Sequence, residues 1–255
     1  MQTKNVIAVI TGGASGLGES CVRSLSKAGA RVAILDIAQE RGEKLAAELG
    51  PNVIFTHADV TSDEGCRSAM KKIVAAFGTI NTAINCAGVA DPGKVLSKKG
   101  PISLDFFNRV LQINLVGTLN VIRLAVEQMV KNEPNEEGEK GVIINTASAA
   151  AFDGQIGQAA YSASKAGVAG MTLPIAREFA DYAVRVVTIA PGLFDTPMMA
   201  GLPESVRVQL AQTIPFPKRL GRPSEYAALV RHIIENPMLN GECIRLDGSL
   251  RMTAR

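Results

Sequence analysis

The sequence predicts a single α/β domain built on a doubly wound parallel sheet. Short apolar runs alternate with longer helical patterns along all 255 residues, and a glycine-rich turn follows the first run. The runs are continuously apolar, as expected for strands that helices cover on both faces. This alternation favours parallel strands joined by right-handed crossovers. We find no internal repeat and no linker, so we expect one domain over residues 1–255.

Seven strands and seven helices are expected, in chain order. The strands are predicted at Val6–Ile10, Arg31–Leu35, Val53–Thr56, Asn81–Ile84, Val142–Thr146, Arg185–Ala190 and Cys243–Leu246. The helices are predicted near 16–28, 40–49, 63–77, 103–132, 158–181, 204–214 and 223–236. Residues 91–101 and the polar stretch 131–140 are rich in Gly, Pro and charge, so both are expected to be exposed loops.

The composition is that of an ordinary globular protein, with 47% apolar and 20% charged residues. A net charge of +3 is too small to indicate a nucleic-acid partner. Four scattered cysteines and two histidines lack the spacing of a zinc site, so no metal is expected. Free cysteines suit a reducing compartment, and we expect neither a secretory leader nor a bilayer-spanning stretch. The simplest expectation is a cytoplasmic protein without a membrane partner.

The first strand leads directly into the turn TGGASGLG, which contains Gly12, Gly16 and Gly18. A strand, a glycine-rich turn and a helix N-terminus form an anion site, because free N–H groups point outward and the helix dipole favours negative charge. Glycine also lets the backbone approach a pyrophosphate closely. The spacing differs from the usual Gly-x-Gly-x-x-Gly, and a tight turn without a ligand is the alternative.

Asp36 stands at the end of the second strand, where an acid can accept hydrogen bonds from an adenosine ribose and repel a 2′-phosphate. We therefore expect the cofactor NAD, not NADP. The alternative is that Asp36 only caps a turn. Arg31 and Arg41 lie nearby in sequence and weigh against the NAD assignment.

Two further strand ends are expected to border the cofactor. Asp59 follows the third strand, where it can cap the helix that starts near Ser62, meet the adenine amino group, or do both. Cys86, Ala87 and Gly88 follow the fourth strand. Their small size would let the backbone lie beside the cofactor, although the segment alone indicates only a turn.

Tyr161 and Lys165 are spaced i and i+4 and therefore share one face of a helix. A phenol with a pKa of about 10 is a weak base near neutral pH, but a neighbouring ammonium group lowers that pKa. Tyr161 would then accept a proton from an alcohol as hydride leaves its carbon, or donate it to a ketone. The alternative is a surface tyrosine beside a solvated lysine.

Ser148 and Asn114 complete the candidate catalytic set. Ser148 follows the fifth strand, where open α/β sheets hold ligands, and its hydroxyl can orient a substrate oxygen; it can equally be a turn or capping serine. Asn114 is a mediocre helix former inside a long helical pattern. It either holds a water that links Lys165 to solvent or is a tolerated amide.

Together these residues resemble the short-chain dehydrogenase/reductase family. The matching elements occur in the family's order: Thr11-Gly12, Gly16, Gly18, Asp59, Asn85-Cys86-Ala87-Gly88, Asn114, Ser148, Tyr161, Lys165, Pro191-Gly192 and Thr196. The resemblance implies a Rossmann fold and an Asn-Ser-Tyr-Lys tetrad. It implies that Lys165 binds the nicotinamide ribose, that Thr196 meets the carboxamide, and that the protein forms a homotetramer. Cys86 departs from the pattern, since many members have a second asparagine there.

Longer stretches, such as GVIINTASAAAFDGQIGQAAYSASK, resemble a branch of that family that acts on 3-hydroxyacyl-CoA and hydroxysteroids. That resemblance implies NAD-dependent interconversion of 3-hydroxyacyl-CoA and 3-oxoacyl-CoA. A hydroxysteroid or other secondary alcohol remains an alternative substrate, and a scaffold role in an RNA-processing complex remains an alternative function. The branch implies substrate contacts from Ser148, Tyr161 and Gln155. It implies cofactor contacts from Ser15, Leu17, Asp36, Asp59, Val60, Cys86, Tyr161, Lys165 and Phe194.

Three segments, 91–103, 149–157 and 193–214, are expected to line the substrate cleft. Their side chains are mostly small or apolar and include two methionines, which form an adaptable surface. Such a lining suits an acyl chain or a steroid better than a sugar. Lys94, Lys98 and Lys99 either meet the phosphates of coenzyme A or are solvated loop lysines.

Overall fold

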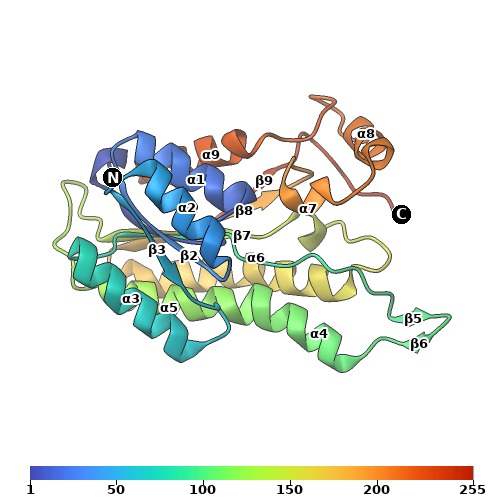
Figure 1. Cartoon of the computed structure of the whole chain (residues 1–255), viewed down its shortest axis with the longest axis horizontal. Coiled ribbons are helices and arrows are strands. Elements are labelled where there is room, and N and C mark those ends of the chain that lie inside the picture. Colours follow the sequence, from blue (N-terminus) through green and yellow to red (C-terminus); the bar gives the residue numbers. More distant parts are fainter. Residues whose placement is uncertain (255) are drawn as a thin grey trace.

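The computed structural model describes residues 1–254 and confirms the predicted fold class. Within that range it contains a seven-stranded sheet in the order β3-β2-β1-β4-β7-β8-β9, with every neighbouring pair parallel (Figure 1). The strand order reverses between β1 and β4. In open α/β sheets ligands bind outside the carboxyl ends of the strands at this reversal.

The strands lie within one or two residues of their predicted bounds. They are β1 (Ile7–Thr11), β2 (Arg31–Asp36), β3 (Val53–His57), β4 (Thr82–Asn85), β7 (Gly141–Thr146), β8 (Val184–Pro191) and β9 (Cys243–Leu246). Four of them are buried at every position. Complete burial explains why these runs are continuously apolar and do not alternate.

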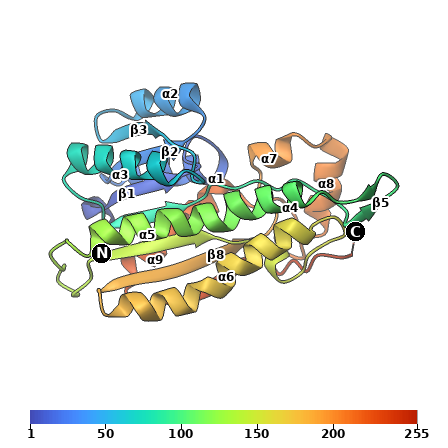
Figure 2. The same ribbon diagram turned by 90° about the horizontal axis from the view of Figure 1, so that it is seen from below.

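Helices cover both faces of the sheet and form two hydrophobic cores. One face carries α1 (Gly16–Lys27), α2 (Gln39–Leu49) and α9 (Pro223–Glu235). The other carries α3 (Asp63–Phe77), α5 (Gly117–Met129) and α6 (Ala159–Ala180), which run side by side in Figure 2. Strand β1 contributes Ala8 and Ile10 to the first core and Ile7 and Val9 to the second, because successive side chains alternate between faces.

The helix predicted near 103–132 is interrupted. It consists of α4 (Leu104–Leu111), a π-helical turn at Gln112–Val116 and α5. The Gly117 N–H donates to the Gln112 carbonyl five residues back, and Thr118 Oγ1 donates to the Asn114 carbonyl over 2.8 Å. The sequence pattern predicts a continuous helix here, because one inserted residue leaves the apolar periodicity nearly intact.

By length and composition alone, the stretch Leu104–Met129 could cross a membrane. The expectation that no such stretch exists is therefore wrong on that measure. Half of its most apolar window is buried inside the protein. Five side chains of α5, among them Ile122 and Met129, belong to the second hydrophobic core, so much of its apolar character is explained by packing.

The loops contain structure that the sequence does not predict. Within the loop 91–101, β5 (Leu96–Ser97) pairs with β6 (Gly100–Pro101) as a short antiparallel hairpin. A short helix, α7 (Pro197–Ala200), precedes α8 (Glu204–Gln212), and 3₁₀ turns lie at Thr3–Asn5 and Ala149–Ala151.

The polar stretch 131–140 is not exposed throughout. Glu139 within it is only 7% exposed and pairs with Arg185 at 2.8 Å. This acid forms a buried ion pair at the amino end of the sheet.

Candidate active site

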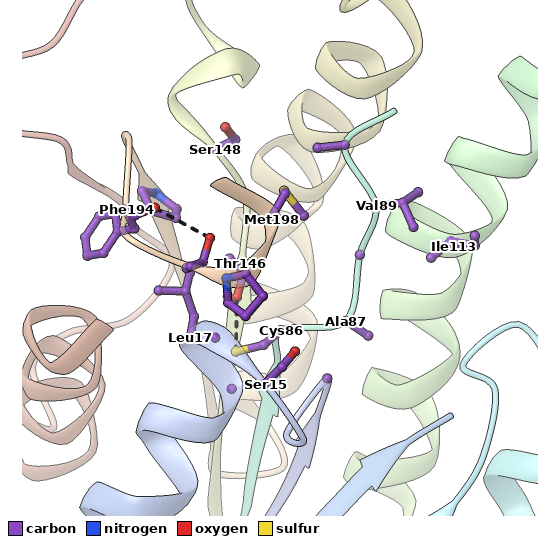
Figure 3. A pocket seen from close by; sticks show the side chains of 18 of the residues that line it. Ser15, Leu17, Cys86, Ala87, Val89, Ile113, Thr146, Ser148, Phe194 and Met198 are labelled. Atoms are coloured by element: carbon purple, nitrogen blue, oxygen red, sulfur yellow. Dashed lines mark hydrogen bonds between the residues drawn. The ribbon is translucent and has the colours of Figure 1, made fainter. Parts of the chain in front are cut away.

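A cavity of about 480 Å³ lies at the carboxyl end of the sheet, where the strand order reverses. In Figure 3, Ser15, Leu17 and Cys86 border one side of it and Ser148 lies across from them. Nearly all predicted site residues line this one cavity. They are Gly12, Ser15, Gly16, Leu17, Gly18, Asp36, Asp59, Val60, Cys86, Ala87, Gly88, Ser148, Tyr161, Lys165, Pro191, Phe194 and Thr196.

Two predicted residues, Asn114 and Gln155, are not in the cavity lining. Asn114 lies fully buried behind it. The Gln155 side chain turns toward the carboxyl-terminal tail, where Nε2 donates to the Thr253 carbonyl over 3.1 Å. The expected contact between Gln155 and substrate is therefore not supported by its position.

The glycine turn fits a dinucleotide because its backbone packs so closely that side chains on Gly12 or Gly18 would clash with neighbouring backbone atoms. Gly12 has φ +63°, and a Cβ there would lie 2.9 Å from the Ala87 nitrogen. A Cβ on Gly18 would lie 2.2 Å from the Gly12 carbonyl oxygen. Ser15 precedes α1 in extended conformation, and its side chain makes no capping hydrogen bond with the described chain. The start of α1 thus provides N–H groups for an anion.

Asp36 is fixed by its own surroundings. Its Oδ2 accepts from the Ala14 N–H over 3.0 Å and its Oδ1 from the Ala38 N–H over 2.9 Å. The carboxylate both orders the turn and lines the cavity, so its capping role is compatible with the predicted contact to a cofactor, which stays a prediction. Arg41 lines the same cavity.

Asp59 does not cap α3 directly. Ser62 is the N-cap, and its Oγ accepts from the Gly65 N–H over 3.0 Å. Asp59 Oδ1 instead accepts from both the N–H and the hydroxyl of Thr61 at 2.8 Å. The next residue, Val60, is held through its carbonyl by Asn120 Nδ2 at 2.8 Å. Sequence reasoning missed Asn120, because no local pattern links it to a loop 60 residues earlier.

The turn after β4 is tied to the glycine turn. Thr11 Oγ1 accepts from the Cys86 and Ala87 N–H groups at 3.1 Å each. The Cys86 sulfur lies 3.6 Å from Thr146 Oγ1 and 3.9 Å from the Tyr226 hydroxyl. A hydrogen bond from the Cys21 thiol, assisted by these hydroxyls, lowers the pKa of the Cys86 thiol. Neither Tyr226 nor Cys21 was a predicted site residue.

Tyr161 and Lys165 share one face of α6, as predicted, and both line the cavity. The Lys165 Nζ lies 5.9 Å from the Tyr161 ring centroid and donates to the Thr146 carbonyl at 2.8 Å. Burial lowers the pKa of Lys165 to about 8. The ammonium group therefore carries most of its charge at neutral pH.

The expected net lowering of the Tyr161 pKa is not found in this state of the protein. Burial raises the pKa of Tyr161, and a hydrogen bond with the Ser148 side chain opposes that rise. The physical reason is that Lys165 is itself buried and donates to the Thr146 carbonyl. Desolvation is therefore the largest influence on the pKa of the phenol.

Ser148 and Asn114 support Tyr161 from two sides. Ser148 Oγ accepts from the Ala150 N–H at 3.1 Å, so this serine caps a 3₁₀ turn and also lines the cavity. Asn114 Oδ1 accepts from the Val89 N–H at 2.8 Å, and its Nδ2 donates to the Ser164 hydroxyl at 3.0 Å. The Ser164 hydroxyl donates to the Tyr161 carbonyl at 2.7 Å. The Tyr161 backbone is thus connected to the turn after β4.

Ser164 is a site residue that the sequence reasoning missed, although it stands inside the quoted motif. Its signal is the i+3 spacing from Tyr161, which places a small polar side chain one helical turn away. The water-holding role expected of Asn114 is untested. What its position supports is a direct role in bracing the site.

The arrangement combines two chemical capacities. The glycine turn and the start of α1 can bind a pyrophosphate, and Ser148, Tyr161 and Lys165 can move a proton at an alcohol or ketone oxygen. Among residues 1–254 no group of three or more His, Cys, Asp and Glu side chains could hold a metal ion.

Comparison with known proteins agrees with this geometry. A family model described as short chain dehydrogenase matches residues 6–207. The 3-hydroxyacyl-CoA dehydrogenase type-2 proteins of Drosophila melanogaster and Homo sapiens are each 55% identical over 251 residues, 98% of this chain and 98% and 96% of theirs. A crystal structure of 3-hydroxyacyl-CoA dehydrogenase type-2 from Mycobacterium avium is similar, with a TM-score of 0.93 and 40% identity over 97% of this chain and 96% of that one.

Proposed function

We propose, because this chain belongs to the short-chain dehydrogenase family, that it interconverts 3-hydroxyacyl-CoA and 3-oxoacyl-CoA with NAD. The observation that carries the proposal is the common cavity. Ser148, Tyr161 and Lys165 line it together with a glycine turn suited to a dinucleotide, in a chain 55% identical to enzymes named for this substrate class.

The chain's own residues supply the proton chemistry. In oxidation, the Ser148 hydroxyl orients the substrate hydroxyl toward Tyr161, which accepts the proton after its own phenol proton has left. Burial raises the pKa of Tyr161 in the free protein, so this phenolate form is disfavoured before the reaction begins. In reduction the Tyr161 hydroxyl returns that proton to the ketone oxygen. The Lys165 ammonium group, held by the Thr146 carbonyl, stabilises negative charge that develops on the phenol. NAD, when bound, supplies the nicotinamide that exchanges hydride with the substrate carbon.

Two residues behind the site act through position. Asn114 and Ser164 fix the backbone at Tyr161, so the phenol needs little reorganisation when the reaction begins. Replacing Tyr161 with Phe should lower turnover by about 10²–10⁴-fold while NADH binding persists. Full turnover by Tyr161→Phe would refute the role assigned to Tyr161. A scaffold function, in contrast, should survive the loss of turnover in this variant.

We propose NAD over NADP because of Asp36. Two backbone N–H groups hold its carboxylate at the cavity wall, where it can accept from ribose hydroxyls and repel a 2′-phosphate. The test compares kcat/KM for the two cofactors in the wild type and in Asp36→Asn. We expect the wild type to favour NAD and the variant to lose about tenfold of that preference, roughly 1.4 kcal/mol. A preference of the wild type for NADP would refute the assignment of NAD, and Arg41 would then be the candidate for binding the 2′-phosphate.

The proposed substrate class is supported by the apolar wall formed by Leu193, Met198 and Met199. Methionine side chains adapt to varied shapes, so an acyl chain fits this wall and a hydroxysteroid is the second candidate. Reduction of acetoacetyl-CoA with NADH tests the first. Good turnover of a steroid ketone without any turnover of acetoacetyl-CoA would refute the proposed acyl-CoA substrate and favour a hydroxysteroid. The assignments of the fold and the cofactor site would be unaffected.

We also propose a homotetramer, supported by exposed apolar side chains on α5, α6 and the π-helical turn that precedes α5, among them Leu119, Leu173 and Val116. Light scattering of the purified protein tests this, and a monomer at micromolar concentration would contradict it.

Free thiols at all four cysteines support a reducing compartment, and we propose the cytoplasm with neither membrane nor nucleic acid as partner. Cell fractionation decides the location. A membrane-bound or organellar fraction would overturn it.

A further inference from the structure

The carboxyl-terminal tail, residues 251–254, reaches the cavity. After β9 the chain turns at 247–250 and continues to the same end of the molecule as α7 and α8 (Figure 1). Met252 of this tail lines the cavity together with Met198 and Met199 of α7. Two segments more than 50 residues apart therefore contribute the same flexible, apolar side chain to one wall.

The tail is fastened to the loop that joins the two catalytic elements. Gln155 Nε2 donates to the Thr253 carbonyl at 3.1 Å, and the Ile156 N–H donates to the Ala254 carbonyl at 3.0 Å. This loop connects the 3₁₀ turn capped by Ser148 to the start of α6, which carries Tyr161. The tail is thus placed on the substrate side of the cavity, beside the residues that move the proton.

The root of the tail is anchored to the same loop by Arg245. Its guanidinium group donates to Asp153 and to Asp247 at 2.6 Å each, and to the Leu250 carbonyl at 2.9 Å. It also lies 5.2 Å from the centroid of the Phe152 ring. Charge-assisted hydrogen bonds that converge on one planar group fix geometry well. Residues 251–254 are therefore held on both sides, by Arg245 at the preceding turn and by the loop at Gln155 and Ile156.

We propose that this tail forms the substrate-side wall of the cavity and that Met252 is a specificity-determining residue, with Gln155 positioning it. The identity of the substrate rests on the proposed function, whereas the position of the wall does not. Gln155, expected from the sequence to touch substrate, acts instead through the tail. The side-chain volume at position 252 therefore limits the size of the group carried beyond the reacting carbon.

The first experiment changes that volume in both directions. Met252→Ala and Met252→Phe are compared with wild type for kcat/KM on acetoacetyl-CoA and on longer or branched 3-oxoacyl-CoA thioesters, with NADH. We expect Met252→Ala to shift the ratio toward the larger substrate by about tenfold and Met252→Phe to shift it the other way. The matched control is Met238→Ala, which changes a methionine that is 91% exposed and outside the cavity lining. An unchanged ratio in both Met252 variants overturns the proposal.

If the wild type reduces no thioester, the proposed substrate class fails. The ratio is then taken between a small and a bulky ketone that the enzyme does reduce. This keeps the two failures distinct.

The second experiment tests the attachment without turnover. Gln155→Glu keeps the side-chain length but removes the donor to the Thr253 carbonyl. We expect faster hydrogen exchange at the Ile156 amide, unchanged exchange in β1, and the same direction of specificity shift as Met252→Ala. An Ile156 amide that already exchanges like an unprotected loop in the wild type would show that the tail is not held there, and would overturn the proposal.

Discussion

Two buried cations lie at opposite ends of the central sheet, and their surroundings differ. Arg185, at the start of β8, is 7% exposed and pairs with Glu139 at 2.8 Å. It also donates to three carbonyls within 233–239. Lys165, beside the end of β7, is 4% exposed and donates to the Thr146 carbonyl. Within residues 1–254 no ion pair accompanies it.

The difference separates a cation that holds the fold from one that is available for chemistry. Arg185 has a carboxylate and several carbonyls for its donors, so its charge is compensated inside the protein. Lys165 has one carbonyl, that of Thr146, and a favourable Coulombic interaction with Cys86, and burial still lowers its pKa to about 8. Perturbed groups in clefts are candidates for function, whereas compensated pairs belong to structure.

The largest expected effect is on catalysis. Replacing Lys165 with Met removes the ammonium group beside Tyr161 and should lower kcat/KM by about 10²–10⁴-fold. The midpoint of unfolding should be maintained or raised at pH 7, since a buried charge is lost. Steady-state kinetics with chemical denaturation of the same samples checks both. A folded Lys165→Met variant with wild-type kcat/KM would contradict the catalytic role assigned to Lys165.

Replacing Arg185 with Met should do the reverse. It leaves the Met1 ammonium group, 3.2 Å from Oε2, as the ionic partner of the buried Glu139. We therefore expect a loss of about 3 kcal/mol in the free energy of unfolding, the lower end for a broken buried ion pair. KM for NADH should remain unchanged at temperatures where the variant is folded. Arg23→Met, which removes a largely exposed pair with Glu48, is the matched control and should cost far less. Equal losses in the two variants would contradict the structural role of Arg185.

The pH dependence of stability sharpens the comparison. Lys165 has a folded-state pKa of about 8, below its unfolded value of about 10.4. Between these values the unfolded chain binds the extra proton, so this group makes stability rise with pH. The free energy of unfolding of wild type relative to Lys165→Met should therefore increase by up to about 3 kcal/mol from pH 7.5 to 10.5. If the difference in unfolding free energy between wild type and Lys165→Met does not change with pH, the pKa of Lys165 is not lowered by burial and the side chain is in contact with solvent.

The smallest expected effect concerns the support beneath Lys165. Tyr226→Phe removes the 2.7 Å hydrogen bond to Thr146 Oγ1, and we expect a loss of about 1–2 kcal/mol in stability. Tyr182→Phe, at an exposed position, is the control and should lose nothing measurable. Denaturant titration of both variants measures these changes in the free energy of unfolding. Equal stabilities would mean that the Thr146–Tyr226 bond contributes nothing net.

Much of the fold was predictable because it depends on local patterns. Continuous apolar runs located the strands to within one or two residues, and the glycine turn and the Tyr161–Lys165 spacing located the cavity. The raised pKa of Tyr161 was not predictable, because spacing reports a neighbour but not the degree of burial. Nor were the roles of Tyr226 and Gln155, because their partners lie 80 and 98 residues away in the chain.

The π-helical turn at Gln112–Val116 has a consequence for how this protein can change. One α-helical residue corresponds to about 100° of rotation about the helix axis. Deleting one residue from this turn would therefore rotate either α4 or the segment containing Asn114 and α5, so that different side chains face the rest of the protein. The length of the turn thus fixes how α4, next to the β5–β6 hairpin, is rotated about the helix axis relative to α5 in the core. We therefore expect the neighbouring hairpin loop to tolerate insertions far more readily than a one-residue change of length here.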